Sequence, residues 1–91
     1  MKYKLFYTLK AKKDLAHLDK KIVNRILDKL DSFIESGDPL SRAKKLINNK
    51  QEVYRFRIGN YRAIFDIDNS GKIIILLILR IKHRKEVYKN F

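Results

Sequence analysis

The sequence has no cysteine and no tryptophan, and it contains only one proline, one methionine and two histidines. Without cysteine, the chain can form neither a disulfide nor a thiolate nucleophile, and zinc sites built on cysteine are excluded. Two histidines are too few for a convincing metal site, so we expect neither a metal nor another cofactor.

Long apolar runs are absent too. The longest such run, residues 73–79, is far shorter than the ~20 residues that span a bilayer. Residues 1–15 lack the apolar core of a signal peptide. We therefore expect a cytoplasmic protein without a membrane role. We also expect a single domain over residues 1–91, because chains of this length seldom divide.

Positive charge dominates the composition. The chain has 22 lysine and arginine residues against 10 aspartate and glutamate residues, which gives a net charge of +12 and a pI near 10.1. A charge of this sign attracts polyanions such as nucleic acid, an anionic membrane or an acidic protein. Lysine-rich chains can also be basic without any nucleic-acid role, and that alternative stays open here.

The first part of the chain predicts a strand followed by two helices. Residues 2–8 alternate in polarity as a half-buried strand does, and a short helix follows. Asp19 fits the N-cap of a longer helix with one apolar face, and Gly37 and Pro39 fit its end. The apolar residues of that face are Ile22, Val23, Ile26, Leu27, Leu30, Phe33 and Ile34.

The remaining sequence predicts three more strands. A basic connector (40–50) leads to a β-hairpin (53–68), and a turn then leads to a strand (72–81) whose unbroken apolar sequence indicates burial on both faces. Residues 82–91 are expected to form a short helical tail. The predicted fold is α+β, with a small, antiparallel-rich four-stranded sheet and an N-terminal helical hairpin packed on one face. The predicted order is β-α-α-β-β-β.

The hairpin distributes its arginines unusually. A two-residue turn at Gly59-Asn60 sets Arg57 opposite Arg62. Side-chain alternation then places Arg55, Arg57 and Arg62 on one face of the hairpin and an apolar set on the other, toward the helices. The apolar set is Tyr54, Phe56, Ile58, Tyr61, Ala63, Phe65 and Ile67.

Arginine opposite arginine is unfavourable in a sheet. Directly opposed residues have Cβ atoms ~4.5–5.5 Å apart, where like charges repel. Glu52 and Asp66 can relieve this repulsion, or the face is simply solvated. Alternatively, the arginines bind phosphate, which guanidinium groups hold through paired hydrogen bonds. Because broken local rules often mark functional sites, the spacing favours a phosphate site.

The same stretch resembles a known protein family. The motif EVYRFRIGNYRAIFDID, the apolar strand after it and the terminal HRKEVY are together similar to the RelE/ParE superfamily of toxins from type II toxin–antitoxin systems. KKL at residues 44–46 also fits the pattern, and the resemblance covers essentially the whole chain. Within this superfamily, the sequence resembles the RelE-type mRNA interferases most.

The resemblance implies a function and partners. RelE-like toxins cleave mRNA on the ribosome without a metal, and a cognate antitoxin silences them. The implied activity is an endoribonuclease in which a 2′-hydroxyl attacks the adjacent phosphate. This chemistry needs cations around the developing charge, a base and an acid. The implied partners are the ribosome, mRNA and an acidic, RelB-like antitoxin in a hetero-oligomer.

The resemblance also implies site residues. The implied catalytic set is Arg55, Arg57, Arg62, His83, Arg84 and Tyr88, and the implied RNA- or phosphate-binding set is Lys44, Lys45 and Lys82. Arg55 and Arg57 stand where well-studied RelE toxins have two lysines, and arginine makes a poor general base. His83 is the alternative base or acid, because histidines commonly titrate near neutral pH. Tyr88 can stack on or orient a nucleotide.

Two other functions stay open. A ParE-type toxin has the same fold but inhibits DNA gyrase through protein contact, and it needs no phosphate site. A non-catalytic nucleic-acid-binding module would explain the net charge but leaves Arg57 opposite Arg62 unexplained.

Overall fold

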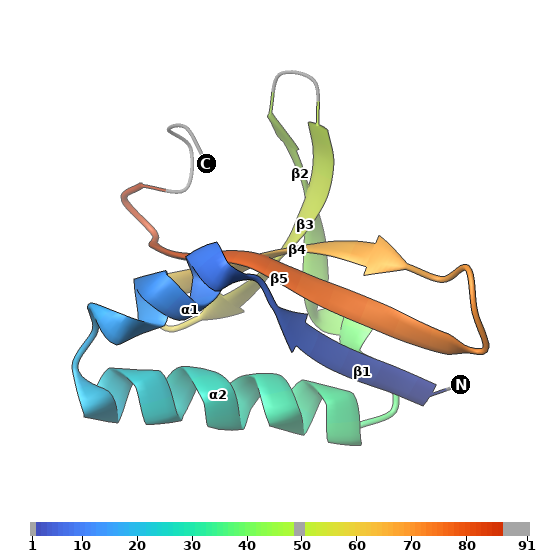
Figure 1. Ribbon diagram of the computed structural model, residues 1–91, viewed down its shortest axis with the longest axis horizontal. Helices are drawn as coiled ribbons and strands as arrows, with labels where there is room; N and C mark the ends of the chain where they lie inside the picture. Colours follow the sequence, from blue (N-terminus) through green and yellow to red (C-terminus); the bar gives the residue numbers. More distant parts are fainter. Residues whose placement is uncertain (1, 49–50, 87–91) are drawn as a thin grey trace.

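The computed structural model describes residues 2–48 and 51–86, which form one sheet and two α-helices. The elements are β1 (Lys2–Tyr7), α1 (Leu9–Ala16), α2 (Lys20–Glu35), the 3-10 helix η1 (Pro39–Arg42), β2 (Ala43–Asn48), β3 (Gln51–Ile58), β4 (Tyr61–Asp68) and β5 (Ile73–His83). The strand order is β1-β5-β4-β3-β2 (Figure 1). β1 runs parallel to β5, and the other neighbouring strands are antiparallel.

The prediction of a four-stranded sheet is wrong by one strand. The basic connector contains η1 and β2, and β2 pairs with β3 along its whole length, from Ala43 opposite Phe56 to Asn48 opposite Gln51. Two lysines follow one another in β2, and lysine is depleted in strands, so the sequence shows no strand pattern there. The segment nevertheless forms a strand, because it hydrogen-bonds to the edge of β3 despite its low strand propensity.

The helices form as predicted, with small differences at their ends. The Thr8 side chain caps α1 by accepting a hydrogen bond from the Ala11 N–H at 3.1 Å. Asp19 is the N-cap residue of α2, although its side chain makes no capping bond. Gly37 follows the end of α2 with φ +78°, a conformation that glycine adopts at little cost. Within the described residues, no helix is long and apolar enough to cross a membrane.

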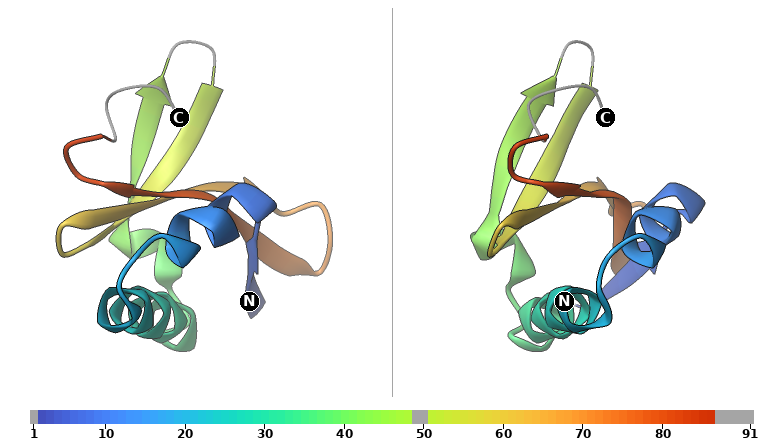
Figure 2. Two further views of the ribbon diagram at one scale, coloured as in Figure 1. Left: turned by 60° about the vertical axis from the view of Figure 1, so that its left-hand side comes forward. Right: turned by 90° about the vertical axis from the view of Figure 1, so that its left-hand side faces the viewer.

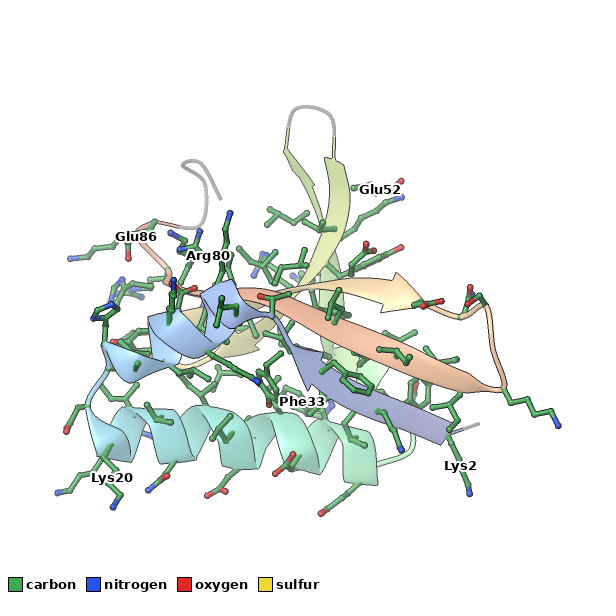
Figure 3. The ribbon with its side chains drawn as sticks, in the orientation of Figure 1. Lys2, Lys20, Phe33, Glu52, Arg80 and Glu86 are labelled. Carbon is green, nitrogen blue, oxygen red and sulfur yellow. The ribbon has the colours of Figure 1, made fainter. Side chains whose placement is uncertain are left out.

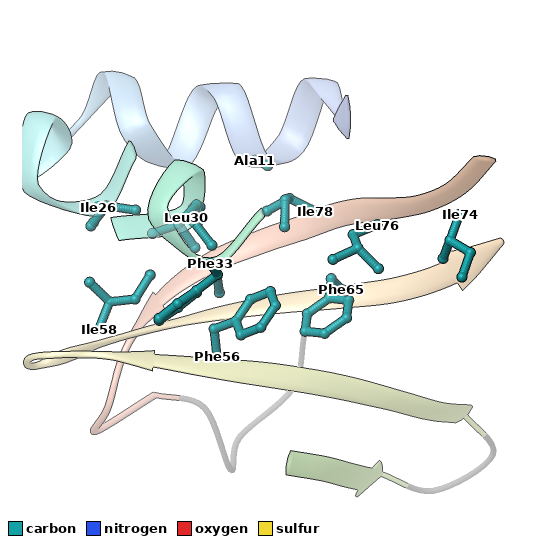
Figure 4. Packing of buried hydrophobic residues seen from close by; sticks show 12 residues of the cluster. Ala11, Ile26, Leu30, Phe33, Phe56, Ile58, Phe65, Ile74, Leu76 and Ile78 are labelled. Atoms are coloured by element: carbon teal, nitrogen blue, oxygen red, sulfur yellow. The ribbon is translucent and has the colours of Figure 1, made fainter. Parts of the chain in front are cut away.

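The hydrophobic core lies between both helices and one face of the sheet (Figure 4). Its centre is aromatic: the Phe56 and Phe65 rings stack with centroids 4.3 Å apart, and the Phe33 ring of α2 lies 4.9 Å from that of Phe56. Phe56 and Phe65 come from neighbouring strands of the hairpin and are fully buried. The predicted apolar face of the hairpin is therefore confirmed.

The hairpin register is also confirmed. Gly59 has φ +57°, which allows the tight turn, and Arg57 lies opposite Arg62 as the turn predicted. β2 pairs antiparallel with β3, and Figure 2 shows the outer part of this β2–β3 pair rising above the sheet. The turn after β5 rises on the same side (Figure 2).

β5 differs from its prediction in two ways. It lies inside the sheet between β1 and β4, but only its helix-facing residues are fully buried. Those facing the other side, such as Ile75 and Leu77, are half-buried, because neither α1 nor α2 covers that face. The prediction that a helical tail begins at residue 82 is also wrong. Pairing with β4 extends β5 through Lys82 and His83, and residues 84–86 form a turn.

Candidate nucleic-acid interface

Six cations gather on the sheet face that points away from the helices, and we call this surface the basic face. It consists of Lys44, Arg55, Arg57, Arg62, Arg80 and Lys82. The pairing register arranges them in two neighbouring rows. In one row, Arg57 lies opposite Arg62, which lies opposite Lys82. In the next, Lys44 lies opposite Arg55, and Ile64 separates Arg55 from Arg80.

A β-bulge in β5 completes the basic face. Phe65 pairs with Ile78, but Ile64 pairs with Arg80, so Leu79 is the extra residue. In a regular strand, Arg80 would follow Ile78 toward the core, because every second residue shares a face. The bulge instead lets Ile81 take the next buried position and puts Arg80 and Lys82 on the same face of the sheet as the arginines.

Arg62 is the most buried cation of the basic face, with 9% of its surface exposed. Its Nη1 atom donates to the Gly59 carbonyl at 2.9 Å and to the Tyr61 carbonyl at 2.8 Å. These oxygens belong to the hairpin turn, so Arg62 stabilises the turn and holds its charge in a fixed place. Arg57, its cross-strand neighbour, is exposed.

Arg80 is held by a carboxylate from α1. Its Nε and Nη2 atoms donate to the two Asp14 oxygens at 2.8 and 3.0 Å, and the Ile81 N–H donates to Asp14 at 2.9 Å. Burial would raise the pKa of Asp14, but these hydrogen bonds and the charges of Arg80 and Lys82 outweigh it and lower the pKa. Asp14 thus anchors Arg80 and Ile81, which follow the bulge, to α1.

The two carboxylates expected near the arginines have other partners. Glu52 forms an ion pair with Lys45. Asp66 shares the side of β4 that carries Arg62, but its carboxylate accepts the N–H of the next residue, Ile67, at 2.8 Å. These contacts do not support the explanation that Glu52 and Asp66 neutralise the arginines.

Two predicted site residues lie on the other side of the sheet. Lys45 pairs with Tyr54, whose ring packs against Phe65 of the core, and so alternates away from Lys44. His83 pairs with Tyr61, and their rings meet edge to face with centroids 5.3 Å apart. The structure therefore groups neither residue with Arg57 and Arg62.

The residues after β5 are partly described. The Arg84 N–H donates to the Asn60 carbonyl at 2.7 Å, which ties the turn after β5 to the hairpin turn, and the Arg84 side chain is exposed. The predicted site residue Tyr88 lies outside the described residues. Arg84 thus lies at the end of the sheet that carries the Arg57 row.

A pocket of about 240 Å³ opens at this end of the sheet, between the end of α1 and the end of β5. Its lining includes His17, Lys82, His83 and Glu86. Figure 3 shows Glu86 and Arg80 at the same end of the molecule, on the side of α1 away from α2. Within the described residues, no group of three or more metal-ligating side chains can hold a metal ion.

The arrangement indicates what the basic face can do. Guanidinium groups bind phosphate oxygens bidentately and stabilise additional negative charge on them. Two residues that shape the basic face, Arg80 and its partner Asp14, were not predicted from the sequence. They are 66 residues apart in the chain, and their contact depends on the bulge. Because residues 73–79 are all apolar, the sequence shows no alternation from which the bulge could be predicted.

Comparison with known proteins defines the family. Residues 5–88 match the family model described as the ParE toxin of the type II toxin–antitoxin system parDE. Toxin RelG of Mycobacterium tuberculosis is 28% identical over 90 residues, covering 99% of this chain and 100% of the relative. Because the family model covers most of the chain, this protein belongs to the RelE/ParE superfamily and is a toxin of a type II toxin–antitoxin system.

Solved structures agree with this assignment. The toxin–antitoxin complex RelBE2 from Mycobacterium tuberculosis contains a chain 25% identical to this one, with a TM-score of 0.74 over 92% of this chain and 100% of that chain. The archaeal RelE–RelB complex from Pyrococcus horikoshii matches at 28% identity and a TM-score of 0.65, over 92% of this chain and 97% of that chain. The RelE-like fold predicted from the sequence is therefore shown, apart from the additional strand.

Proposed function

We propose that this toxin is a ribosome-dependent endoribonuclease that binds and cleaves mRNA on its basic face without a metal. The observation that carries the proposal is the row formed by Arg57, Arg62 and Lys82, in which three cations are direct cross-strand neighbours. Like charges that are direct cross-strand neighbours repel one another, so a bound anion would be attracted to this row. The curated relative is named RelG, and two solved relatives are named RelE complexes, which also favours this activity.

In the proposed reaction, a ribose 2′-oxygen attacks the adjacent phosphorus. The bond between phosphorus and the 5′-oxygen breaks, which leaves a 2′,3′-cyclic phosphate and a 5′-hydroxyl. The 2′-hydroxyl gives up its proton to a base, and the departing 5′-oxygen receives one from an acid. Arg57 and Lys82 contact the phosphate oxygens, while Arg62 stabilises the developing charge from its fixed position.

The other predicted residues take different places in this proposal. Arg55 and Lys44 form the neighbouring row and bind an adjacent phosphate. Lys45 is left out, because it lies on the other side of the sheet and pairs with Glu52. Roles for His83, Arg84 and Tyr88 in proton transfer or nucleotide binding stay predictions.

We also propose an acidic antitoxin as the partner. Two of the similar solved structures are complexes of a RelE toxin with a RelB antitoxin. With a net charge of +12, this chain is attracted to an acidic protein over a long range. The antitoxin and the ribosomal RNA would then compete for the same positive potential.

A translation reaction with mapping of mRNA 5′ ends tests the activity. Purified wild type should produce cuts in phase with codons, and Arg57→Gln should slow their appearance by at least about 100-fold. Arg25→Gln is a matched control, because it removes the same charge from an exposed position on α2.

Two alternative outcomes would contradict the proposal. Intact mRNA together with inhibition of DNA gyrase would establish the ParE-type activity, which the matching family model keeps as the second candidate. Salt-dependent RNA binding without cleavage products would indicate a binding module instead.

A further inference from the structure

β5 loses one of its two neighbouring strands at the bulge. β1 pairs with it only as far as Tyr7, which lies opposite Ile78, whereas β4 pairs with it as far as His83. From Leu79 onward, no strand of residues 2–48 and 51–86 pairs with the other edge of β5. The end of β5 that carries Lys82 is therefore held by strand pairing on one side alone.

Helix α1 and its N-cap residue bind this edge instead. The hydroxyl of Thr8, the N-cap residue, donates to the carbonyl of Leu79 at 2.9 Å. Asp14, in the last turn of α1, accepts hydrogen bonds from the Arg80 guanidinium and from the Ile81 N–H. These contacts hold three consecutive residues, which are the bulge residue and the two that follow it.

The contact made by Asp14 is the stronger of the two. Its carboxylate accepts three hydrogen bonds, and two of them come from the Arg80 guanidinium in a bidentate arrangement. Charge-assisted hydrogen bonds are roughly twice as strong as neutral ones. The Arg80 and Asp14 side chains are 24% and 17% exposed, so water and salt screen their charges only in part. Asp14 is therefore a firm anchor for the backbone after the bulge.

Lys82 lies between this anchor and a second one. The residue before it donates its N–H to Asp14, and the Arg84 N–H donates to the Asn60 carbonyl at 2.7 Å. Lys82 itself lies opposite Arg62, whose guanidinium is fixed by the hairpin turn. The two anchors thus determine where Lys82 lies relative to the fixed charge of Arg62.

The charge of Asp14 cannot explain its place beside the basic face. A carboxylate there repels phosphate and lowers the positive potential that attracts RNA. Electrostatics alone therefore predicts that removing this carboxylate strengthens RNA binding. A geometric contribution has the opposite sign, because a misplaced group near the reacting atoms slows a reaction steeply.

We propose that Asp14 is a positioning residue of the basic face, which holds the end of β5 through Arg80 and Ile81 so that Lys82 lies beside Arg62 at the phosphate. Asp14 itself contacts no RNA. This inference rests on the function proposed above, because it concerns the rate of mRNA cleavage.

Cleavage rates with toxin in excess over mRNA-programmed ribosomes test the inference. Rates at increasing toxin concentration give a maximal rate and a half-saturating concentration. Asp14→Ala should lower the maximal rate by at least about ten-fold. The half-saturating concentration should not rise, because the substitution removes a negative charge. Asp28→Ala is a matched control, since it removes the same charge from an exposed position on α2 and should leave the maximal rate unchanged.

Asp14→Asn separates geometry from charge. It removes the same charge as Asp14→Ala, but its carboxamide oxygen can still accept the Ile81 N–H. Its maximal rate should therefore stay within about three-fold of wild type. A domain of ordinary stability stays folded after the loss of one such contact, and urea unfolding in the reaction buffer checks each variant.

A double-mutant cycle with Lys82→Gln distinguishes positioning from a general loss of structure. If Asp14 acts through Lys82, adding Asp14→Ala to Lys82→Gln should lower the maximal rate by less than about two-fold more.

Three results would overturn the inference while cleavage by wild type still supports the proposed function. They are a wild-type maximal rate in Asp14→Ala, equal maximal rates in Asp14→Ala and Asp14→Asn, and independent losses in the double variant. Absence of cleavage by wild type would instead overturn the proposed function, and this inference with it.

Discussion

The two halves of β5 present different chemistry on the side away from the helices. Before the bulge, Ile75 and Leu77 are half-buried, and Leu77 lies beside Phe6 of β1, which is 50% exposed. We call these three residues the apolar strip. After the bulge, Arg80 and Lys82 occupy the corresponding side and join the basic face.

The core beneath both halves is the same. Ile78 before the bulge and Ile81 after it are both buried against the helices. One additional residue, Leu79, thus lets cations follow apolar residues on this side of β5 without interrupting the core, and Leu79 itself packs against the buried cluster of Leu46, Val53 and Ile64. Bulges are commonly found beside active sites for this reason, since they redirect side chains locally.

The largest difference between the basic face and the apolar strip is expected in mRNA cleavage. Arg57→Gln should lower the cleavage rate by about 10²–10³-fold, the usual cost of losing one group that stabilises transition-state charge. Its stability should change little, because Arg57 is exposed. The rate of appearance of new mRNA 5′ ends measures the first effect and urea unfolding measures the second. A variant that cleaves at the wild-type rate would remove Arg57 from the site.

A smaller effect, on stability, is expected when the contact between α1 and the part of β5 after the bulge is removed. Asp14→Ala leaves the Arg80 guanidinium and the Ile81 N–H without this acceptor, in a place where the two charged side chains are 24% and 17% exposed. We expect a loss of about 2 kcal/mol in the free energy of unfolding, measured with urea. Asp14→Asn should lose less, since its carboxamide oxygen can still accept the Ile81 N–H. A loss of less than about 0.5 kcal/mol in Asp14→Ala would show that the contact does not stabilise the bulge.

The contribution of Asp14 should also depend on pH. Its pKa is lowered in the folded chain from the ordinary 3.8, so the unfolded chain binds this proton more tightly. The stabilisation is therefore complete at pH values above 3.8 and is lost as the pH falls through the lowered value. Unfolding free energies of wild type and Asp14→Asn, measured from neutral to acidic pH, should converge at the acidic end. A constant difference between them would contradict the assignment.

The smallest effect is expected in the apolar strip. Phe6→Gln replaces an exposed aromatic residue of β1 that lies beside Leu77, so cleavage should stay at the wild-type rate and stability should change by less than about 0.5 kcal/mol. The translation reaction and urea unfolding check both expectations. A loss of cleavage comparable to that of Arg57→Gln would mean that the apolar strip and the basic face do not differ in function.

The parts of the fold governed by local rules could be predicted from the sequence. The turn at Gly59-Asn60 determined the register of the hairpin, and alternation then determined which face carries Arg57. Strand β2 could not be predicted, because its lysines carry little strand propensity and the edge of β3 decides its structure.

The site was predictable to a lesser extent. The shared face of Arg55, Arg57 and Arg62 was predicted from spacing, but the side on which His83 and Lys45 lie depends on strand pairing beyond the hairpin. The contact between Asp14 and Arg80 joins residues far apart in the chain. A single sequence contains no direct signal for such a contact.

The central claim is that the basic face, and not the apolar strip, carries the toxic activity. The most direct measurement compares Arg57→Gln with Phe6→Gln in one translation reaction, by mapping mRNA 5′ ends over time. We predict codon-phased cuts at the wild-type rate for Phe6→Gln and a loss of at least about 100-fold for Arg57→Gln. Equal cleavage by the two folded variants, or no cleavage by wild type, would contradict the claim.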